Sequence, residues 1–228
     1  MNLLSILIQA QNAAISTPEA EEIKLSLWEL AKEGGWIMIV LAIFSVIAVY
    51  IFTERFIAIN RASKRDDNFM NLIRNFMIEG QLDKAKELCK VTNTSISRMI
   101  EKGISRIGKP LNDIQTAIEN VGNLEVSKLE KGVALIGMIS GAAPMLGFLG
   151  TVTGMIRAFY DMSMAGNNID IELLSAGIYE AMVTTVGGLF VGILAYIFYN
   201  IIVAKIDKVV NLLESKSVEF MDVLNEPA

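Results

Sequence analysis

The sequence predicts an all-α membrane protein with three transmembrane helices, and three observations lead to this class. Hydrophobic residues make up 53% of the 228 residues, and the mean hydropathy is +0.46, which is high for a soluble domain. Three long uncharged runs account for the excess: 34–53, 132–156 and 181–204. About 20 apolar residues in a helix cross the hydrocarbon layer. Lys and Arg are also distributed unevenly around these runs.

The distribution of Lys and Arg predicts the orientation in the membrane. Only Lys24 and Lys32 precede the first run, and only Arg157 lies between the second and third. The other 17 of the 20 follow the first run or the third. The positive-inside rule therefore places residues 54–131 and the C-terminus in the cytoplasm and the N-terminus outside. The net charge of −5 argues against nucleic acid as a partner.

The first elements are a segment on the outer side and a span that faces lipid. We expect residues 1–33 to form an interfacial segment in which Thr17 and Pro18 begin a helix. The first span, 34–53, is rich in Ile, Val and Leu and has few small residues. That composition suits contact with the bilayer over much of its surface.

The region 54–131 predicts a helical cytoplasmic part. Apolar residues recur at helical spacing in three short stretches between 66 and 109, and Gly108, Lys109 and Pro110 interrupt the pattern. We expect Asn112 to cap a long helix that continues through Lys131 into the second span without a break. The second and third helices would then both extend into the cytoplasm.

The second span, 132–160, differs from the first because small residues dominate it. Gly137 with Gly141, and Gly150 with Gly154, form small-xxx-small pairs that allow two helix backbones to approach closely. Pro144 lacks a backbone N–H and is expected to kink the helix. Over the second and third spans we assign helix packing and kinking to Pro144, Gly147, Gly150, Gly154, Gly187 and Gly188.

The third span, 173–204, follows a short outer loop, 161–172, and contains one acid, Glu180. From residue 173 to 204 no other Asp, Glu, Lys or Arg occurs. A carboxylate at the centre of such a helix costs roughly 2.5–3.5 kcal/mol on insertion scales, so it normally faces a cavity, a pore or a partner. A spacing of four residues places Glu180 on one side of the helix with Thr184 and Gly188. We expect a cytoplasmic helix and tail over 205–228, helical to about Val223.

Several kinds of chemistry are excluded by composition. The chain has no His and a single Cys, Cys89, so it has no internal disulfide, no Cys/His zinc site and no histidine base. We interpret Cys89 as a core residue and expect no catalytic residue, metal or cofactor. The candidates for a proton pathway are one acid and four hydroxyls: Glu180, Thr151, Thr153, Thr184 and Thr185. A threonine hydroxyl can also simply bond to its own helix, and this alternative stays open.

The second and third spans resemble the ExbB/TolQ/MotA family of ion-motive-force motor proteins. The resemblance lies in residues 143–156, APMLGFLGTVTGMI, and 177–189, GIYEAMVTTVGGL. The three-span layout, the outer N-terminus and the length resemble ExbB and TolQ, whereas MotA proteins have a fourth span and fit less well; we take ExbB as the nearest type. Glu180 matches the family's third-span glutamate, Thr151 and Thr185 match its two pore threonines, and Pro144 matches its second-span proline. Relatives often have a proline about fourteen residues after the glutamate, where this chain has Leu194.

The resemblance implies a homopentamer in the bacterial inner membrane whose second and third spans line a central pore. The pore would hold the single spans of an ExbD- or TolR-type dimer, whose aspartate carries the proton. Glu180 would then be a wall residue that tunes the pore. The complex would act on TonB to drive outer-membrane transport or, as a TolQ-like alternative, on TolA in outer-membrane constriction and integrity.

Other classes explain the residues less well. A scaffold that conducts no ions would explain the small-residue pairs but not Glu180. A secondary transporter predicts inverted repeats and broken helices, and no internal repeat is present. A membrane enzyme would need a nucleophile with its base, or a metal site, and the sequence offers neither.

Overall fold

The computed structural model describes residues 35–63, 67–164 and 171–225, and helices dominate these ranges. They are α3 (Gly35–Ala62), α4 (Asp67–Ile78), α5 (Leu82–Thr92), α6 (Ser95–Ile104), α7 (Leu111–Glu130), α8 (Val133–Met164) and α9 (Ile171–Asn225). Three segments are long and apolar enough to span a membrane. The predicted all-α membrane class is therefore confirmed. The predicted segment 1–33 lies outside the described residues.

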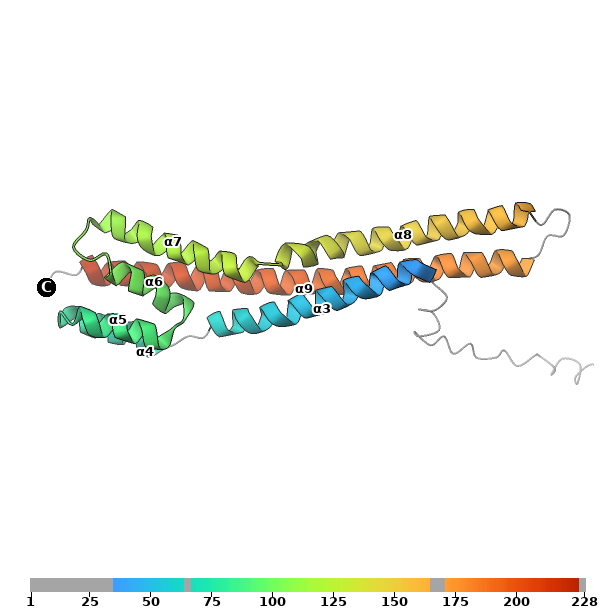
Figure 1. The fold of residues 1–228 in the computed structure, drawn as a ribbon. Coiled ribbons are helices and arrows are strands. Elements are labelled where there is room, and N and C mark those ends of the chain that lie inside the picture. Colours follow the sequence, from blue (N-terminus) through green and yellow to red (C-terminus); the bar gives the residue numbers. More distant parts are fainter. Residues whose placement is uncertain (1–34, 64–66, 165–170, 226–228) are drawn as a thin grey trace, which may run out of the picture.

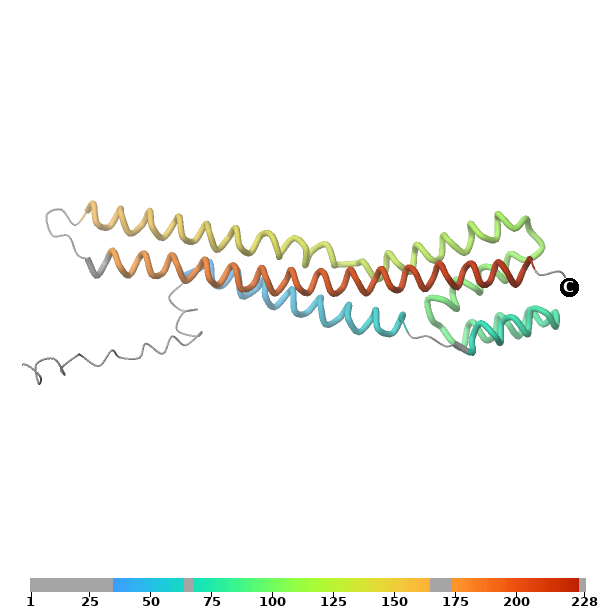
Figure 2. Tube along the Cα trace, turned by 180° about the vertical axis from the view of Figure 1, so that it is seen from behind, coloured from blue at the N-terminus to red at the C-terminus, as the bar shows by residue number. Residues whose placement is uncertain are grey.

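The molecule is long and narrow, and α9 runs along its whole length (Figure 1). α8 follows one half of α9 and α7 follows the other half, while α3 lies alongside the middle of α9 (Figures 1 and 2). The short helices α4, α5 and α6 gather at the end where α9 finishes. The described helices thus form an apolar membrane part of three helices and a compact helical part at one end.

α7 and α8 are two helices, so the prediction of one uninterrupted helix is wrong. α7 ends at Glu130, Lys131 has a non-helical ψ of 121°, and Gly132 has a φ of +83°. A positive φ favours glycine, which lacks the Cβ that makes this backbone costly. The apolar stripe runs on across the break, and for this reason the spacing of residues alone could not reveal it. Asn112 is also not the cap, because Pro110 precedes the first helical residue, Leu111.

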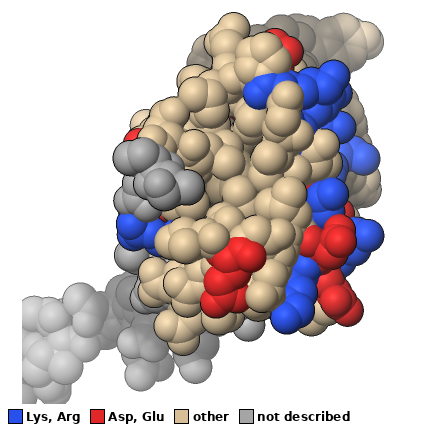
Figure 3. All heavy atoms as spheres, turned by 90° about the vertical axis from the view of Figure 1, so that its left-hand side faces the viewer, with Lys and Arg blue, Asp and Glu red and all other residues tan. Residues whose placement is uncertain are grey.

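The compact helical part at one end has its own hydrophobic core, which the long C-terminal half of α9 completes. Its most deeply buried side chains come from four helices: Ile73, Ile100, Ile118, Val209 and Phe220. The three short helices predicted between 66 and 109 are confirmed as α4, α5 and α6. Cys89 is buried in this core. Seen from this end, charged side chains gather mainly towards the edges of a largely uncharged surface (Figure 3).

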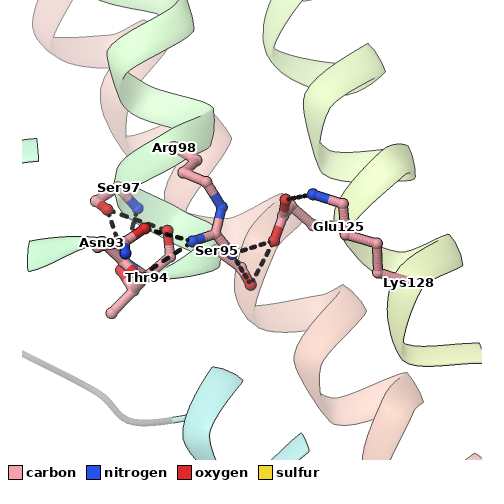
Figure 4. A network of polar contacts seen from close by, with 7 residues as sticks. All are labelled: Asn93, Thr94, Ser95, Ser97, Arg98, Glu125 and Lys128. Atoms are coloured by element: carbon pink, nitrogen blue, oxygen red, sulfur yellow. Dashed lines mark hydrogen bonds and ion pairs between the residues drawn. The ribbon is translucent and has the colours of Figure 1, made fainter. Parts of the chain in front are cut away.

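A buried acid, Glu125, joins α6 to α7 (Figure 4). Its side chain is only 4% exposed. It accepts hydrogen bonds from Ser95 Oγ at 3.0 Å, from Lys128 Nζ at 2.6 Å, and from Arg98 Nη2. Burial alone would raise the pKa of Glu125, but these bonds outweigh burial and lower it from 4.5 to about 2. Glu125 therefore stays charged at neutral pH and ties the two helices together.

The C-terminal end of α3 makes polar and aromatic contacts with its neighbours. Arg55 Nη1 donates to the carbonyl oxygen of Lys128 at 2.8 Å, at the end of α7. Phe52 stacks on Phe198 with ring centroids 4.1 Å apart. Lys205 Nζ, on α9, lies 4.4 Å from the centroid of the Phe56 ring and donates to Asn60 Oδ1 at 2.8 Å. These contacts hold the C-terminal end of α3 against α9.

Candidate functional site between the second and third spans

α8 and α9 pack so closely that several glycines on them have no room for a side chain. A Cβ on Gly188 would lie 2.6 Å from the carbonyl oxygen of Ala143 and 2.8 Å from Gly147 Cα. A Cβ on Gly154 would lie 3.0 Å from Ala181 Cβ. The contacts recur along the pair, so the small residues form one antiparallel seam, which we call the α8–α9 seam.

Pro144 lies inside α8, and α9 provides the space for its ring. A Cβ on Gly192 would lie 2.5 Å from Pro144 Cγ and 3.1 Å from the carbonyl oxygen of Ser140. That carbonyl is the one that Pro144 cannot bond, because proline has no N–H. Because Gly192 has no side chain, it leaves room for both the Pro144 ring and the unbonded Ser140 carbonyl. The residue spacing did not predict this role for Gly192.

Three threonines meet in the α8–α9 seam around two backbone carbonyls. Thr151 on α8 and Thr185 on α9 are hydrogen-bonded through their hydroxyls. The Gly147 carbonyl accepts from Thr185 Oγ1 at 3.2 Å and from Thr184 Oγ1 at 3.3 Å. The Ala181 carbonyl accepts from Thr184 Oγ1 at 2.7 Å and from Thr151 Oγ1 at 3.0 Å. We call Thr151, Thr184 and Thr185 the threonine cluster, because their hydroxyls link α8 to α9.

Thr153 lies apart from this cluster. It is exposed, and its hydroxyl bonds to carbonyls of its own helix, Leu149 at 2.9 Å and Gly150 at 3.2 Å. Thr151 differs, because its bond to its own helix, at 3.4 Å to Gly147, is longer than its bond across the seam. A membrane threonine can bond to its own helix or to a neighbouring helix, and both cases occur here. Thr153 bonds within α8, and Thr151 bonds to α9.

Glu180 lies outside the threonine cluster and faces the first span. Its side chain is half-buried, and a Cβ placed on Gly35 would lie only 2.8 Å from Glu180 Oε1. Gly35 is the first residue of α3. The spacing of four residues predicts one shared side for Glu180 and Thr184, but each step of four advances about 40° around a helix. Gly187 likewise faces α3, where Met38 Sδ would lie 2.9 Å from its Cβ.

The outer faces of α8 and α9 are apolar and largely exposed. Met145 and Phe148 on α8, and Val186 and Phe190 on α9, are each more than 60% exposed. Burying such side chains in a bilayer or against other helices is favourable. Among the described residues, no group of three or more His, Cys, Asp or Glu side chains is placed to hold a metal ion.

Three apolar helices, a seam of small residues and an acid within a span define a multi-pass protein of the inner membrane. Comparison with known families then gives its family. The profile of the MotA/TolQ/ExbB proton channel family matches residues 91–215, which is more than half of the chain. The chain belongs to this family, whose members are transport subunits and not a known class of enzymes.

The curated relatives described here are named as ExbB proteins or as TolQ. A putative biopolymer transport protein ExbB-like 1 of Synechocystis is 29% identical over 75% of this chain and 68% of its own length. An ExbB homologue of Methanothermobacter thermautotrophicus is 26% identical over 82% of this chain and 66% of its own. The Tol-Pal system protein TolQ of Haemophilus influenzae is 32% identical over 44% of this chain and 42% of its own. The protein is thus an energy-transducing membrane subunit of the ExbB/TolQ type.

Proposed function

We propose that this protein is the ExbB-like subunit of an inner-membrane motor that the proton-motive force drives. The observation that carries the proposal is the pairing of Thr151 with Thr185 across the α8–α9 seam, one turn from Glu180 on a span with no other charge. A proton path through a membrane needs acids, hydroxyls or water. We assign the path to Glu180 and the hydroxyls Thr151, Thr153, Thr184 and Thr185.

The chain functions as part of a larger assembly. One acid and a few hydroxyls are too few groups for a continuous proton path within a single subunit, and the sequence has no His to relay a proton. A partner with a single span and its own carboxylate, of the ExbD type, completes the path. Five copies of this chain surround a dimer of that partner, with α8 and α9 lining the pore. The exposed apolar faces of these two helices support such packing.

The work of the motor is to energise outer-membrane transport through a TonB-type protein. Each proton crossing the membrane releases roughly 2.3 kcal/mol per 100 mV, enough to turn a loosely held partner. A TolQ-like role in outer-membrane constriction and integrity is the second candidate, and the similarity to the Haemophilus influenzae TolQ favours it. The protein that co-purifies with this chain distinguishes the two roles.

The test measures proton flux through the purified complex. The chain is isolated together with its single-span partner, placed in liposomes, and the internal pH is followed after a potential is imposed. We expect Glu180→Ala to reduce the flux by on the order of a hundredfold. Asp207→Asn is the matched control, because Asp207 is an exposed acid on the same helix beyond the membrane part.

Native mass spectrometry of the same samples completes the test. We expect the parent and Glu180→Ala complexes to have the same mass, because the acid makes none of the contacts in the α8–α9 seam. A parental flux that Glu180→Ala leaves unchanged would overturn the role of Glu180. A complex that conducts no protons in any variant would identify the chain as a scaffold.

A further inference from the structure

Gly35, at the start of the first span, lies directly against Glu180. Its φ is +62°, in the left-handed region that favours glycine. A Cβ at this position would lie 2.8 Å from Oε1 of Glu180, so the carboxylate, which is at the end of a flexible side chain, would have to shift. Backbone conformation therefore favours glycine here, and an added methyl group would displace the acid. Neither observation concerns lipid contact, which is the role that the sequence predicts for this span.

The contact with Glu180 belongs to a continuous α3–α9 interface. Gly187 follows Glu180 by seven residues, which is about two helical turns, so both lie on one side of α9. A Cβ on Gly187 would lie 2.9 Å from Met38 Sδ and 3.7 Å from Leu41 Cδ1. Leu41 is 1% exposed. The first turns of α3 lie against α9 (Figures 1 and 2). The acid is thus held at an interface between two spans.

The start of α3 is a favourable place for a carboxylate. A helix leaves its first four N–H groups without acceptors inside the helix, and its N-terminus carries partial positive charge. α3 has no acid or base between Gly35 and Thr53 other than Tyr50. Among the residues whose side chains the structure describes, the other titratable groups near this end are Arg157, Tyr160 and Asp161 on α8 and Tyr179 on α9. Within the described ranges none of these groups forms a hydrogen bond or ion pair with Glu180.

We propose that Gly35 is a positioning residue for Glu180, so that the first span forms one wall of the acid's site. The proposal rests on the role of Glu180 in proton flux given above. Because Gly35 has no side chain, the Glu180 carboxylate lies against the N-terminus of α3. Gain or loss of a proton at Glu180 then changes how firmly the outer end of α3 is held to α9. The first span takes part in the proton cycle.

The first test substitutes Gly35→Ala in the full complex and measures proton flux as a function of pH. We expect a loss on the order of tenfold and a displaced pH profile, because the added methyl moves the carboxylate. Gly80→Ala is the matched control: Gly80 has a φ of +70°, but nothing lies within 4 Å of its Cβ. In the Gly35→Ala background, Glu180→Asp should restore part of the flux, since the shorter side chain makes room. Equal pH profiles for Gly35→Ala and Gly80→Ala would overturn the proposal.

The second test does not depend on ion flow. Trp36 follows Gly35 and is 67% exposed, and Trp28→Phe leaves it as the only tryptophan. We expect the fluorescence of Trp36 to change with pH in this complex and the change to disappear with Glu180→Gln. Asp161→Asn should preserve it. A change that Glu180→Gln leaves intact would contradict the positioning role. If flux does not depend on Glu180 but the Trp36 signal does, the proposed function fails and the contact stands.

Discussion

The threonines of the membrane part bond in two ways, across the seam or within their own helix, and sequence does not decide which. Thr151 and Thr153 are two residues apart on α8, so they point to opposite sides of the helix. Thr151 bonds across the α8–α9 seam and Thr153 bonds to its own helix at 2.9 Å. The choice depends on whether a second backbone lies within reach. The hydroxyls were identifiable from the sequence as candidates, but their partners required the packed helices.

At the same scale, Glu125 predicts a dependence of stability on pH. Its pKa is lowered from 4.5 to about 2 in the folded protein. The unfolded chain binds the proton first, so the contribution to stability is present above pH 4.5 and is lost as pH falls towards 2. We expect Glu125→Gln to lower the free energy of unfolding by about 2 kcal/mol at neutral pH. The difference in stability between the parent and the variant should disappear as the pH falls from 4.5 towards 2.

Thermal unfolding of the intact protein in detergent, followed by circular dichroism, measures this difference. Glu119→Gln is the control, because Glu119 is an exposed acid on the same helix. A constant gap between the parent and Glu125→Gln from pH 5 to pH 2 would show that Glu125 is not held by its cationic partners. The acid itself could not be recognised in the sequence, where it is one of several acids on α7.

At the scale of elements, the α8–α9 seam predicts which glycines tolerate a methyl group. Gly188→Ala would place its Cβ 2.6 Å from a backbone oxygen, and backbone cannot move aside as a flexible side chain can. We expect it to destabilise the protein by about 1–3 kcal/mol. Gly141→Ala has nothing within 4 Å of its Cβ and should be neutral or slightly stabilising, since Ala favours helix more than Gly.

Thermal melting of the two variants in detergent checks this difference. Equal melting temperatures would mean that α8 and α9 are not in the contact described. Small-xxx-small spacing identified Gly150 and Gly154 on α8 in advance, but it also marked Gly141, whose Cβ would have nothing within 4 Å. It did not separate Gly188, which faces α8, from its neighbour Gly187, which faces α3. The first span had no distinctive pattern, so its place against α9 came only from the structure.

The break between α7 and α8 is a further feature at this scale. The stripe of apolar residues is continuous there, and neither Lys131 nor Gly132 is a sure stop signal inside a helical pattern. Arg55 of α3 donates to the carbonyl oxygen of Lys128, within the last turn of α7. This contact and the left-handed backbone of Gly132 mark the point where the compact helical part and the three apolar helices meet.

At the scale of the whole molecule, the orientation in the membrane is testable by thiol labelling. The native Cys89 should react little with a thiol reagent, because it is buried. Desolvation and the negative charge of Glu101 raise the pKa of its thiol to about 12, so little reactive thiolate is present. Ser163→Cys and Val91→Cys place exposed thiols at opposite ends of the molecule. We expect a membrane-impermeant reagent applied to intact cells to label Ser163→Cys and to leave Val91→Cys unlabelled.

Permeabilised cells provide the control, because both variants should then react. Labelling of Val91→Cys in intact cells would reverse the orientation inferred from the Lys and Arg distribution. The distance between the two positions reflects the length of α9, which continues from the apolar helices through the core of the compact helical part. One rigid helix therefore connects the region of Glu180 to the far end of the molecule.

The sequence by itself determined the class, the three spans and the family resemblance, because these depend on the length, composition and local spacing of residues. Uncharged runs long enough to cross a membrane and the motif around Pro144 and Glu180 are local features. Only the tertiary structure decided that Thr151 meets Thr185 and that Glu180 faces Gly35. These contacts depend on the rotation of each helix about its axis, which close packing of backbones fixes and which a spacing of four residues leaves open.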